Sequence, residues 1–215
     1  MIPPDKILGN RYEIIKDLGK GGFGDTYLAQ DLHLPGKPHC VVKHLQPKDN
    51  HPAVLSLARR LFDTEAKVLY NLGNQCKQIP TLFAHFEEKG EFYLVQEFID
   101  GHDLTKEIIA DQQLSESDVI TLLKSILEVL AVAHEHQPDA IIHRDIKPAN
   151  LMRRRQDGKI ILIDFGAVRE INQLIVNVNG NVTTTVAIGT RGYAICLGNK
   201  LMANPNYGAM SMLWG

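Results

Sequence analysis

The stretch "IIHRDIKPANLM" at residues 141–152 carries the most chemical information in the chain. It places a carboxylate at Asp145, a cation two residues later at Lys147 and an amide five residues later at Asn150. A carboxylate can accept a hydroxyl proton, a lysine can neutralise a phosphoryl oxygen, and an amide oxygen can bind magnesium. Further on, "LIDFGAV" places Asp164 at the end of an apolar run and before a glycine. An acid at this point is well placed to bind a cation.

A glycine cluster, "LGKGGFGDTY", lies near the start of the chain and contains a GxGxxG spacing. Its candidate phosphate-binding residues are Gly19, Lys20, Gly21, Gly22, Phe23 and Gly24. Glycines let the backbone approach phosphate oxygens and donate N–H groups to them. The spacing alone is weak evidence for phosphate binding, because a plain hairpin turn also fits it. A dinucleotide-dependent oxidoreductase is disfavoured, since that motif needs a strand entering a helix and "YLAQD" is not a helix start.

Lys43 lies in the apolar run "VVKHL" and is therefore a cation beside a predicted core. Such a cation needs an anion, because an unpaired charge near a core is costly. Glu65, 22 residues later in a predicted helix, is a fitting partner. A solvated lysine and a surface role for Glu65 remain the alternatives.

The composition limits the number of domains, the kinds of partner and the location that can be expected. The chain has 215 residues, 44% of them hydrophobic and 22% charged, which fits one large domain or two small lobes. A net charge of -2 gives no reason to expect a nucleic-acid partner or bulk attraction to a membrane. Three dispersed cysteines without CxxC spacing fit reduced thiols and a cytoplasmic location. No stretch has the roughly eighteen apolar residues of a membrane helix, so no membrane segment is expected within the chain.

The apolar periodicity predicts a β-rich part followed by a helical part, joined by a linker near residues 97–103. The expected strands and hairpins cover residues 12–31, 39–46 and 80–99, and short strands follow at 141–143 and 159–166. A helix is expected over residues 53–73, where Gly73 is a plausible stop. A second, amphipathic helix is expected over residues 119–137, with capping chemistry at Ser115.

These motifs, in this order and at these spacings, resemble the eukaryotic-type (Hanks-type) serine/threonine protein kinases, most closely their bacterial members. The resemblance runs from about Tyr12 to Tyr193. It implies an α+β, bilobal protein-kinase-like fold. The β-rich N-lobe would cover residues 12–99, and an incomplete helical C-lobe would cover residues 100–193 through the activation segment.

The resemblance also implies a role for each matched position. Residues 19–24 would cover the phosphates of ATP, and Lys43, paired with Glu65, would hold the α- and β-phosphates. Asp145 would orient and deprotonate the acceptor hydroxyl, and Lys147 would lie on the transferred phosphoryl group. The implied cofactors are ATP and Mg2+, and the implied partner is a protein substrate with serine or threonine.

Two further groups of positions follow from the resemblance. Asn150 and Asp164 would hold Mg2+. The adenine would lie against Thr26, Val41, Glu97, Ile99 and Met152. For Val41 and Met152 a plain core role is equally open. Thr26 and Gln96 are polar at positions where the family more often has apolar residues.

The activation segment offers candidate phosphorylation sites. In the family, the arginine at the position of Arg144 is paired by a phosphate on this segment, because charge-assisted bonds to phosphate order a mobile loop. Thr183, Thr184 and Thr185 are the candidates here. The alternative is that "NVTTTVAI" is only a β-prone segment, which could form a hairpin with "NG" at residues 179–180.

The tail at residues 194–215 departs from the family pattern. The codons of Ala209 to Gly215 can be read in the frame that starts at the third base of the first codon. In that frame they permit Asp-Val-Tyr-Ala-Val-Gly, which resembles the family's continuation. The hypothesis is a frame-shifted translation from about Ala194 onward. Exposed apolar surface on the helix over residues 119–137 is then expected. An inactive nucleotide-binding or interaction fragment is the alternative to an active serine/threonine kinase.

Overall fold

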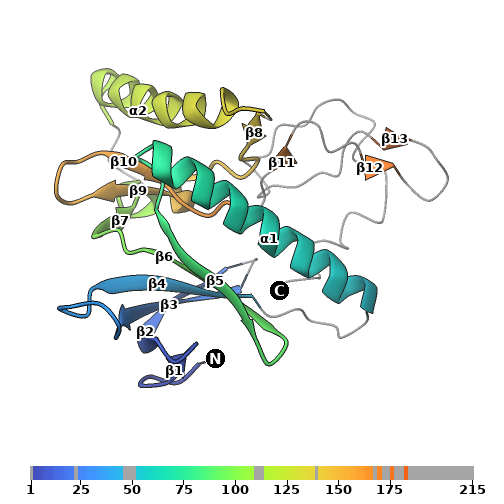
Figure 1. Cartoon of the computed structure of the whole chain (residues 1–215). Coiled ribbons are helices and arrows are strands. Elements are labelled where there is room, and N and C mark those ends of the chain that lie inside the picture. The colour runs from blue at the N-terminus through green and yellow to red at the C-terminus, as the bar shows by residue number, and fades with distance from the viewer. Residues whose placement is uncertain are drawn as a thin grey trace. The chain divides into compact units, whose positions relative to one another are not determined.

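The computed structural model describes residues 2–21, 24–45, 52–108, 114–138 and 140–166, with the backbone of three short strands after Gly166. The chain divides into two compact units (Figure 1). The first contains the residues up to Tyr70 together with Pro80–Phe98. The second contains Asn71–Ile79 and the described residues that follow Phe98. The change of unit after Phe98 falls within the expected linker.

The first unit is built on a six-stranded sheet with the order β1-β2-β3-β4-β6-β5, in which all neighbours are antiparallel. Its strands are β1 (Ile7–Leu8), β2 (Tyr12–Gly21), β3 (Gly24–Asp31), β4 (His39–Leu45), β5 (Leu82–Glu88) and β6 (Glu91–Glu97). Both predicted hairpins and the predicted third strand are confirmed. The second hairpin turns at Lys89 and Gly90, whose φ angles of 56° and 80° suit a tight turn between twisted strands.

Helix α1 (Pro52–Gln75) belongs mainly to the first unit. Ala66, Leu69 and Leu72 are buried, as the apolar period predicts. The expected stop at Gly73 is wrong, because the helix continues to Gln75. The amide of Cys76 donates to the carbonyl of Leu72 at 2.9 Å, so backbone bonding runs past the glycine.

A second apolar cluster lies on the sheet of the first unit and includes the start of the chain. Its buried members are Ile2, Leu8, Tyr12, Ile14, Tyr27, Ala29, Cys40, Val42, Tyr93 and Val95. The amide of Ile2 donates to the Tyr27 hydroxyl at 3.0 Å. The N-terminal segment is therefore part of the packed unit.

The second unit contains helix α2 (Glu116–His134), which begins directly after the predicted cap at Ser115, three residues before the expected start at residue 119, and ends three residues before the expected end at residue 137. The Ser115 side chain caps the helix by accepting a hydrogen bond from the amide of Asp118. Val129 and Ala133 are fully buried. The exposed apolar side chains of α2 are Val119, Ile120, Leu123 and Leu127. The expectation of exposed apolar surface on this helix is therefore met.

Small sheets complete the second unit. The strands β7 (Gly101–Asp103), β9 (Leu151–Arg154) and β10 (Ile160–Leu162) form an antiparallel sheet with the order β10-β9-β7. Two further sheets have two antiparallel strands each. One pairs β8 (Ile141–Ile142) with β11 (Arg169–Glu170), and the other pairs β12 (Ile175–Val176) with β13 (Val182–Thr183). Two short 3-10 turns are η1 (Leu104–Lys106) and η2 (Pro148–Asn150). The sequence misses β7, which occupies the end of the expected linker.

The segment after α1 is fixed within the second unit by polar contacts. The Gln78 amide nitrogen donates to the carbonyl of Ile160 at 3.0 Å and to that of Ser125 at 3.2 Å. The carbonyl of Gln78 accepts from the amide of Leu162 at 2.8 Å. This segment is consequently joined to both α2 and β10. No described helix is long and apolar enough to cross a membrane.

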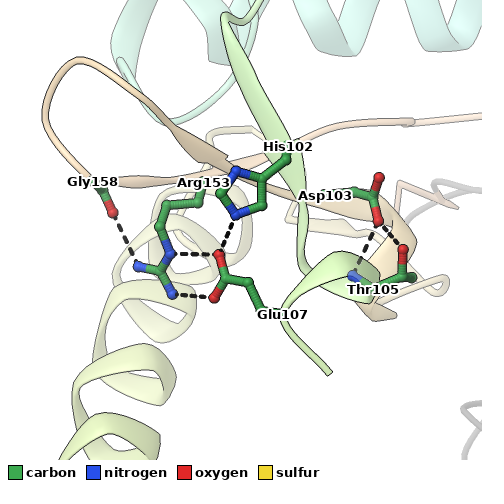
Figure 2. A network of polar contacts seen from close by, with 6 residues as sticks. All are labelled: His102, Asp103, Thr105, Glu107, Arg153 and Gly158. Atoms are coloured by element: carbon green, nitrogen blue, oxygen red, sulfur yellow. Dashed lines mark hydrogen bonds and ion pairs between the residues drawn. The ribbon is translucent and has the colours of Figure 1, made fainter. Parts of the chain in front are cut away.

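A polar network holds β7 and the turn after it against β9 (Figure 2). Glu107 accepts two bonds from the Arg153 guanidinium, at 2.7 and 2.8 Å, and contacts His102 Nε2 at 2.6 Å. Arg153 also donates to the carbonyl of Gly158 at 3.2 Å. The hydrogen bonds from Arg153 lower the pKa of Glu107, with His102 contributing in the same direction. The carboxylate is therefore the centre of this network.

The Glu107–Arg153 pair can be tested by a double-mutant cycle with Glu107→Gln and Arg153→Met. We expect a coupling free energy of about 1 kcal/mol, because the bidentate geometry is good but the pair is partly exposed. Urea unfolding near pH 7 measures it. The control is Arg155 with Asp100, a single contact of 3.2 Å between side chains that are 75% and 67% exposed. A coupling no larger than that of the control contradicts the expectation.

Gly101→Ala tests the close approach of β7 to β9. A Cβ at Gly101 would lie 2.1 Å from the carbonyl oxygen of Arg153, so the two strands would have to separate. We expect a loss of about 3 kcal/mol in the free energy of unfolding. Gly36→Ala is the control, because its Cβ meets nothing within 4 Å and only its φ of 76° is unfavourable, at about 1 kcal/mol. Equal losses would show that this approach is not tight.

Candidate active site

A buried ion pair between Lys43 and Glu65 lies in the first unit. Lys43 Nζ on β4 lies 2.5 Å from Glu65 Oε1 on α1. Their side chains are only 10% and 2% exposed. Opposite charges at this depth need each other, because removing either one leaves an uncompensated charge away from water. The solvated lysine and the surface glutamate, left open by the sequence, are therefore excluded.

His44, which follows Lys43, holds the opposite face of β4 in place. His44 is buried, stacks on Tyr93 with ring centroids 4.8 Å apart, and contacts Glu91 Oε2 at 3.0 Å. Burial lowers the pKa of His44, although Glu91 opposes this. Because alternate residues of a strand face opposite ways, holding His44 on one face directs Lys43 to the other.

The register of the sheet defines which residues share the face of Lys43. Thr26 on β3 pairs directly with Lys43, and Gln96 on β6 pairs with Val41. Directly opposed residues lie on the same face, and residues two apart on a strand share a face. Thr26, Val41 and Gln96 therefore lie on the same face as the lysine. Two of the expected adenine contacts, Thr26 and Val41, are brought together with it.

The glycine cluster occupies the hairpin of β2 and β3. A dinucleotide-binding motif would instead lie between a strand and a helix, so the structure agrees with disfavouring it. The structure describes Gly19, Lys20, Gly21 and Gly24, whereas Gly22 and Phe23 lie outside the described residues. A Cβ at Gly19 would meet nothing within 4 Å, so packing does not require this glycine. A Cβ at Gly24 would lie 2.2 Å from the carbonyl oxygen of His44. Gly24 therefore allows β3 to approach β4 closely.

The remaining expected adenine contacts fall on both sides of the change of unit. Glu97 ends β6, and its amide donates to the carbonyl of Thr81 at 2.9 Å. Ile99 is buried, and Met152 is half-buried on β9, where it pairs with Asp103. Their contact with a base stays a prediction.

Asp145 is the centre of the site in the second unit. It is 4% exposed, and its Oδ2 lies 2.8 Å from Lys147 Nζ. The Asn150 amide nitrogen donates to the same Oδ2 at 3.0 Å and to the carbonyl of Asp145 at 2.8 Å. One carboxylate thus meets both the cation and the amide of the motif, a mutual contact that the sequence analysis did not predict. With its nitrogen facing Asp145, the planar amide of Asn150 directs its oxygen elsewhere.

His143 supports this site and was missed at the level of sequence. Its Nδ1 accepts from the amide of Asp145 at 3.3 Å, and its Nε2 lies 3.2 Å from the carbonyl oxygen of Ile163. Its ring also meets Phe165 edge-on, with centroids 4.9 Å apart. His143 therefore links the loop of Asp145 to the residues on both sides of Asp164. Its place two residues before Asp145 was the available signal.

Asp164 lies in a backbone conformation that is uncommon for a residue with a side chain. Its φ is 64°, and Arg144, next to Asp145, has the same value. Such angles persist where the surroundings impose them, and they concentrate at functional sites. The amide of Ile163 donates to the carbonyl of Asn150 at 2.9 Å, which ties the segment of Asp164 to that of Asn150.

The residues present fit a magnesium ion. Asn150 and Asp164 offer an amide oxygen and a carboxylate, the hard ligands that Mg2+ prefers, and Mg2+ usually takes few protein ligands beside phosphate oxygens. Within the described part of the chain, no cluster of three or more His, Cys, Asp or Glu could hold a metal.

The candidate phosphorylation sites are only partly described. Thr183 lies on β13, whose backbone pairs antiparallel with β12. This pairing agrees with the hairpin alternative. Thr184 and Thr185 lie outside the described residues, as does the tail at residues 194–215.

Comparison with known proteins agrees with this geometry. The family model described as "Protein kinase domain" matches residues 12–214. Serine/threonine-protein kinase PknA of Nostoc is 47% identical over 189 residues, which cover 88% of this chain and 33% of that protein. Serine/threonine-protein kinase C of Synechocystis is 48% identical over 193 residues, 90% of this chain and 36% of that protein. The chain thus spans about a third of the length of these relatives.

A solved structure shows the same fold. The kinase domain of Mycobacterium tuberculosis PknI matches 77% of this chain and 63% of that domain, with a TM-score of 0.62 and 25% identity. The expected kinase fold is confirmed, and the sheet of the first unit corresponds to the β-rich N-lobe. The chain belongs to the protein kinase family.

Proposed function

We propose that the chain transfers the γ-phosphoryl group of ATP to serine or threonine hydroxyls of proteins, with Mg2+ as cofactor. The observation that carries the proposal is the buried Asp145, held between Lys147 and Asn150. Its relatives include serine/threonine-protein kinases at 47% and 48% identity. Lys147 within "RDIKPAN" resembles the serine/threonine branch of the family.

In this mechanism Asp145 is the proton acceptor. The substrate hydroxyl oxygen forms a bond to the γ-phosphorus as the bond to the β–γ bridging oxygen breaks, so ADP leaves and the hydroxyl proton passes to Asp145. Lys147 would neutralise charge on the transferred group while it holds the carboxylate in place. Lys43, oriented by Glu65, would hold the α- and β-phosphates. Mg2+ on Asn150 and Asp164 would supply charge neutralisation at the phosphates. Catalysis is positioning and charge stabilisation.

A second candidate is an inactive nucleotide-binding or interaction fragment. The exposed apolar side chains of α2, such as Leu123 and Leu127, favour it, because surfaces of this kind contact other protein segments.

A cytoplasmic location is also proposed, on the grounds that Cys40 and Cys76 are free thiols.

Autophosphorylation separates the two candidates. We expect incorporation of labelled phosphate with Mg2+ and ATP, and a loss of about 100-fold or more in Asp145→Asn, which has no proton acceptor. Asp157→Asn is the control, because Asp157 is on the surface in a local pair with Arg154. Thermal melting checks that all variants fold. Equal and negligible signals in the wild type and Asp145→Asn would favour the inactive fragment.

The activation segment can be tested in the same reaction. We propose that Thr183, Thr184 or Thr185 receives the phosphate, since Arg144 beside Asp145 can pair with it. Mass spectrometry of the autophosphorylated wild type should place phosphate on at least one of these threonines, with none in Asp145→Asn. A phosphorylated protein whose map lacks all three would overturn the assignment.

A further inference from the structure

A series of hydrogen bonds in the first unit runs from the start of the chain to the edge of the glycine cluster. The amide of Ile2 donates to the Tyr27 hydroxyl at 3.0 Å, and this hydroxyl donates to Asp25 Oδ2 at 3.1 Å. Tyr27 is 1% exposed and Ile2 is 6% exposed, so the bonds between them are shielded from water. Because the hydroxyl accepts from an amide and donates to a carboxylate, each bond strengthens the other.

Asp25 lies at the point where β3 leaves the glycine cluster. It directly follows Gly24, and it lies two residues before Tyr27 on the same strand. Residues two apart on a strand share a face, so the side chains of Asp25 and Tyr27 lie on one face of the sheet. Thr26, between them, pairs with Lys43 on the other face. The bond from Tyr27 to Asp25 therefore holds the start of β3 from the face opposite to the candidate nucleotide site.

The N-terminal segment, residues 2–6, is itself anchored to the sheet. The amide of Asp5 donates to the carbonyl of Ile14 at 2.8 Å, and the amide of Ile14 donates to the carbonyl of Lys6 at 2.9 Å. Ile2 is buried in the apolar cluster on this face of the sheet. The Tyr27 hydroxyl thus joins Asp25 to a segment that the rest of the unit holds in place.

We propose that Tyr27 is a positioning residue, which holds the glycine cluster in the place where its backbone contacts the phosphates of ATP. The inference rests on the proposed function, in which ATP is the phosphoryl donor. Glycines allow many backbone conformations and have no side chains that could fix their position, so a cluster of them depends on contacts at its ends. At Gly24 the backbone lies close to β4. At the next residue, the bond from Tyr27 to Asp25 fixes the strand from its other face.

The test compares ATP with adenosine, which has the same base and ribose but no phosphate. Dissociation constants of magnesium ATP and of adenosine are measured by isothermal titration calorimetry with the whole chain. Tyr27→Phe keeps the ring and removes the hydroxyl. It should weaken the binding of ATP about fivefold, the effect of one hydrogen bond, and should leave the binding of adenosine unchanged. The Tyr27 side chain faces away from the site of the base, so only the contacts with the phosphates should change.

Tyr12→Phe is the matched control. Tyr12 belongs to the same apolar cluster, is 2% exposed, and has a hydroxyl without a hydrogen-bond partner among the described residues. Its loss should change neither dissociation constant. Thermal melting of both variants checks that they fold. A loss of stability alone would reduce the fraction of folded protein, and hence the number of binding sites in the titration, without changing the dissociation constant.

A second pair of variants tests the acceptor of the bond. Asp25→Asn removes the charge and keeps an oxygen that can accept from Tyr27, whereas Asp25→Ala removes both. ATP should bind to Asp25→Ala about fivefold more weakly than to Asp25→Asn. Adding Tyr27→Phe to Asp25→Ala should cause no further loss, because the bond is already absent. Equal affinities of Asp25→Asn and Asp25→Ala would show that Asp25 acts only through its charge, which contradicts the proposal.

The outcomes are distinguishable. Equal affinities of the wild type and Tyr27→Phe for ATP would overturn the role of Tyr27 and leave the proposed function standing. Weakening of ATP and of adenosine by the same factor would also overturn this role, because the effect would then not be confined to the phosphates. A wild type that does not bind ATP would overturn the proposed function together with this inference.

Discussion

The constraint on which the rest of the structure depends is that a buried charge must be paired. The ion pair of Lys43 with Glu65 joins the middle of the sheet to the middle of α1. The sheet and the helix also pack through apolar and aromatic side chains such as Phe62 and Phe92, and the paired charges add a buried contact that requires these two residues to meet. The pair is thus better understood as a device for position than as a source of stability.

The same constraint operates in the second unit with a different solution. Asp145 is even more deeply buried than Lys43, and one cation and one amide within five residues of sequence bond its carboxylate. Because these partners are local, the loop carries its own charge balance. The longer-range contacts of His143 then determine where the loop lies relative to Asp164. Local pairing and long-range anchoring are separate tasks here, performed by different side chains.

This separation explains how much the sequence could predict. The local motif at residues 145–150 showed which residue types would gather at the site, although not their contacts with one another. The apolar period located the hairpins and both helices. The role of Gly24 in strand packing was not predictable, because it depends on where the carbonyl of His44 lies. The short strand β7 was missed for the same reason. Its pairing with β9 joins residues about fifty positions apart, and no pattern within residues 101–103 signals it.

Some strained or unsatisfied groups lie at candidate functional residues, where local stability alone does not explain them. In the second unit, φ angles of 64° at Arg144 and Asp164 adjoin the candidate catalytic and metal-binding groups. In the first, the buried Gln96 oxygen receives no hydrogen bond from the described residues, and Gln96 shares a face with Lys43. A sequence selected for folding alone would remove such costs, since a glycine or an apolar residue would do so at each position. The costs at Arg144 and Asp164 are therefore explained by function better than by folding.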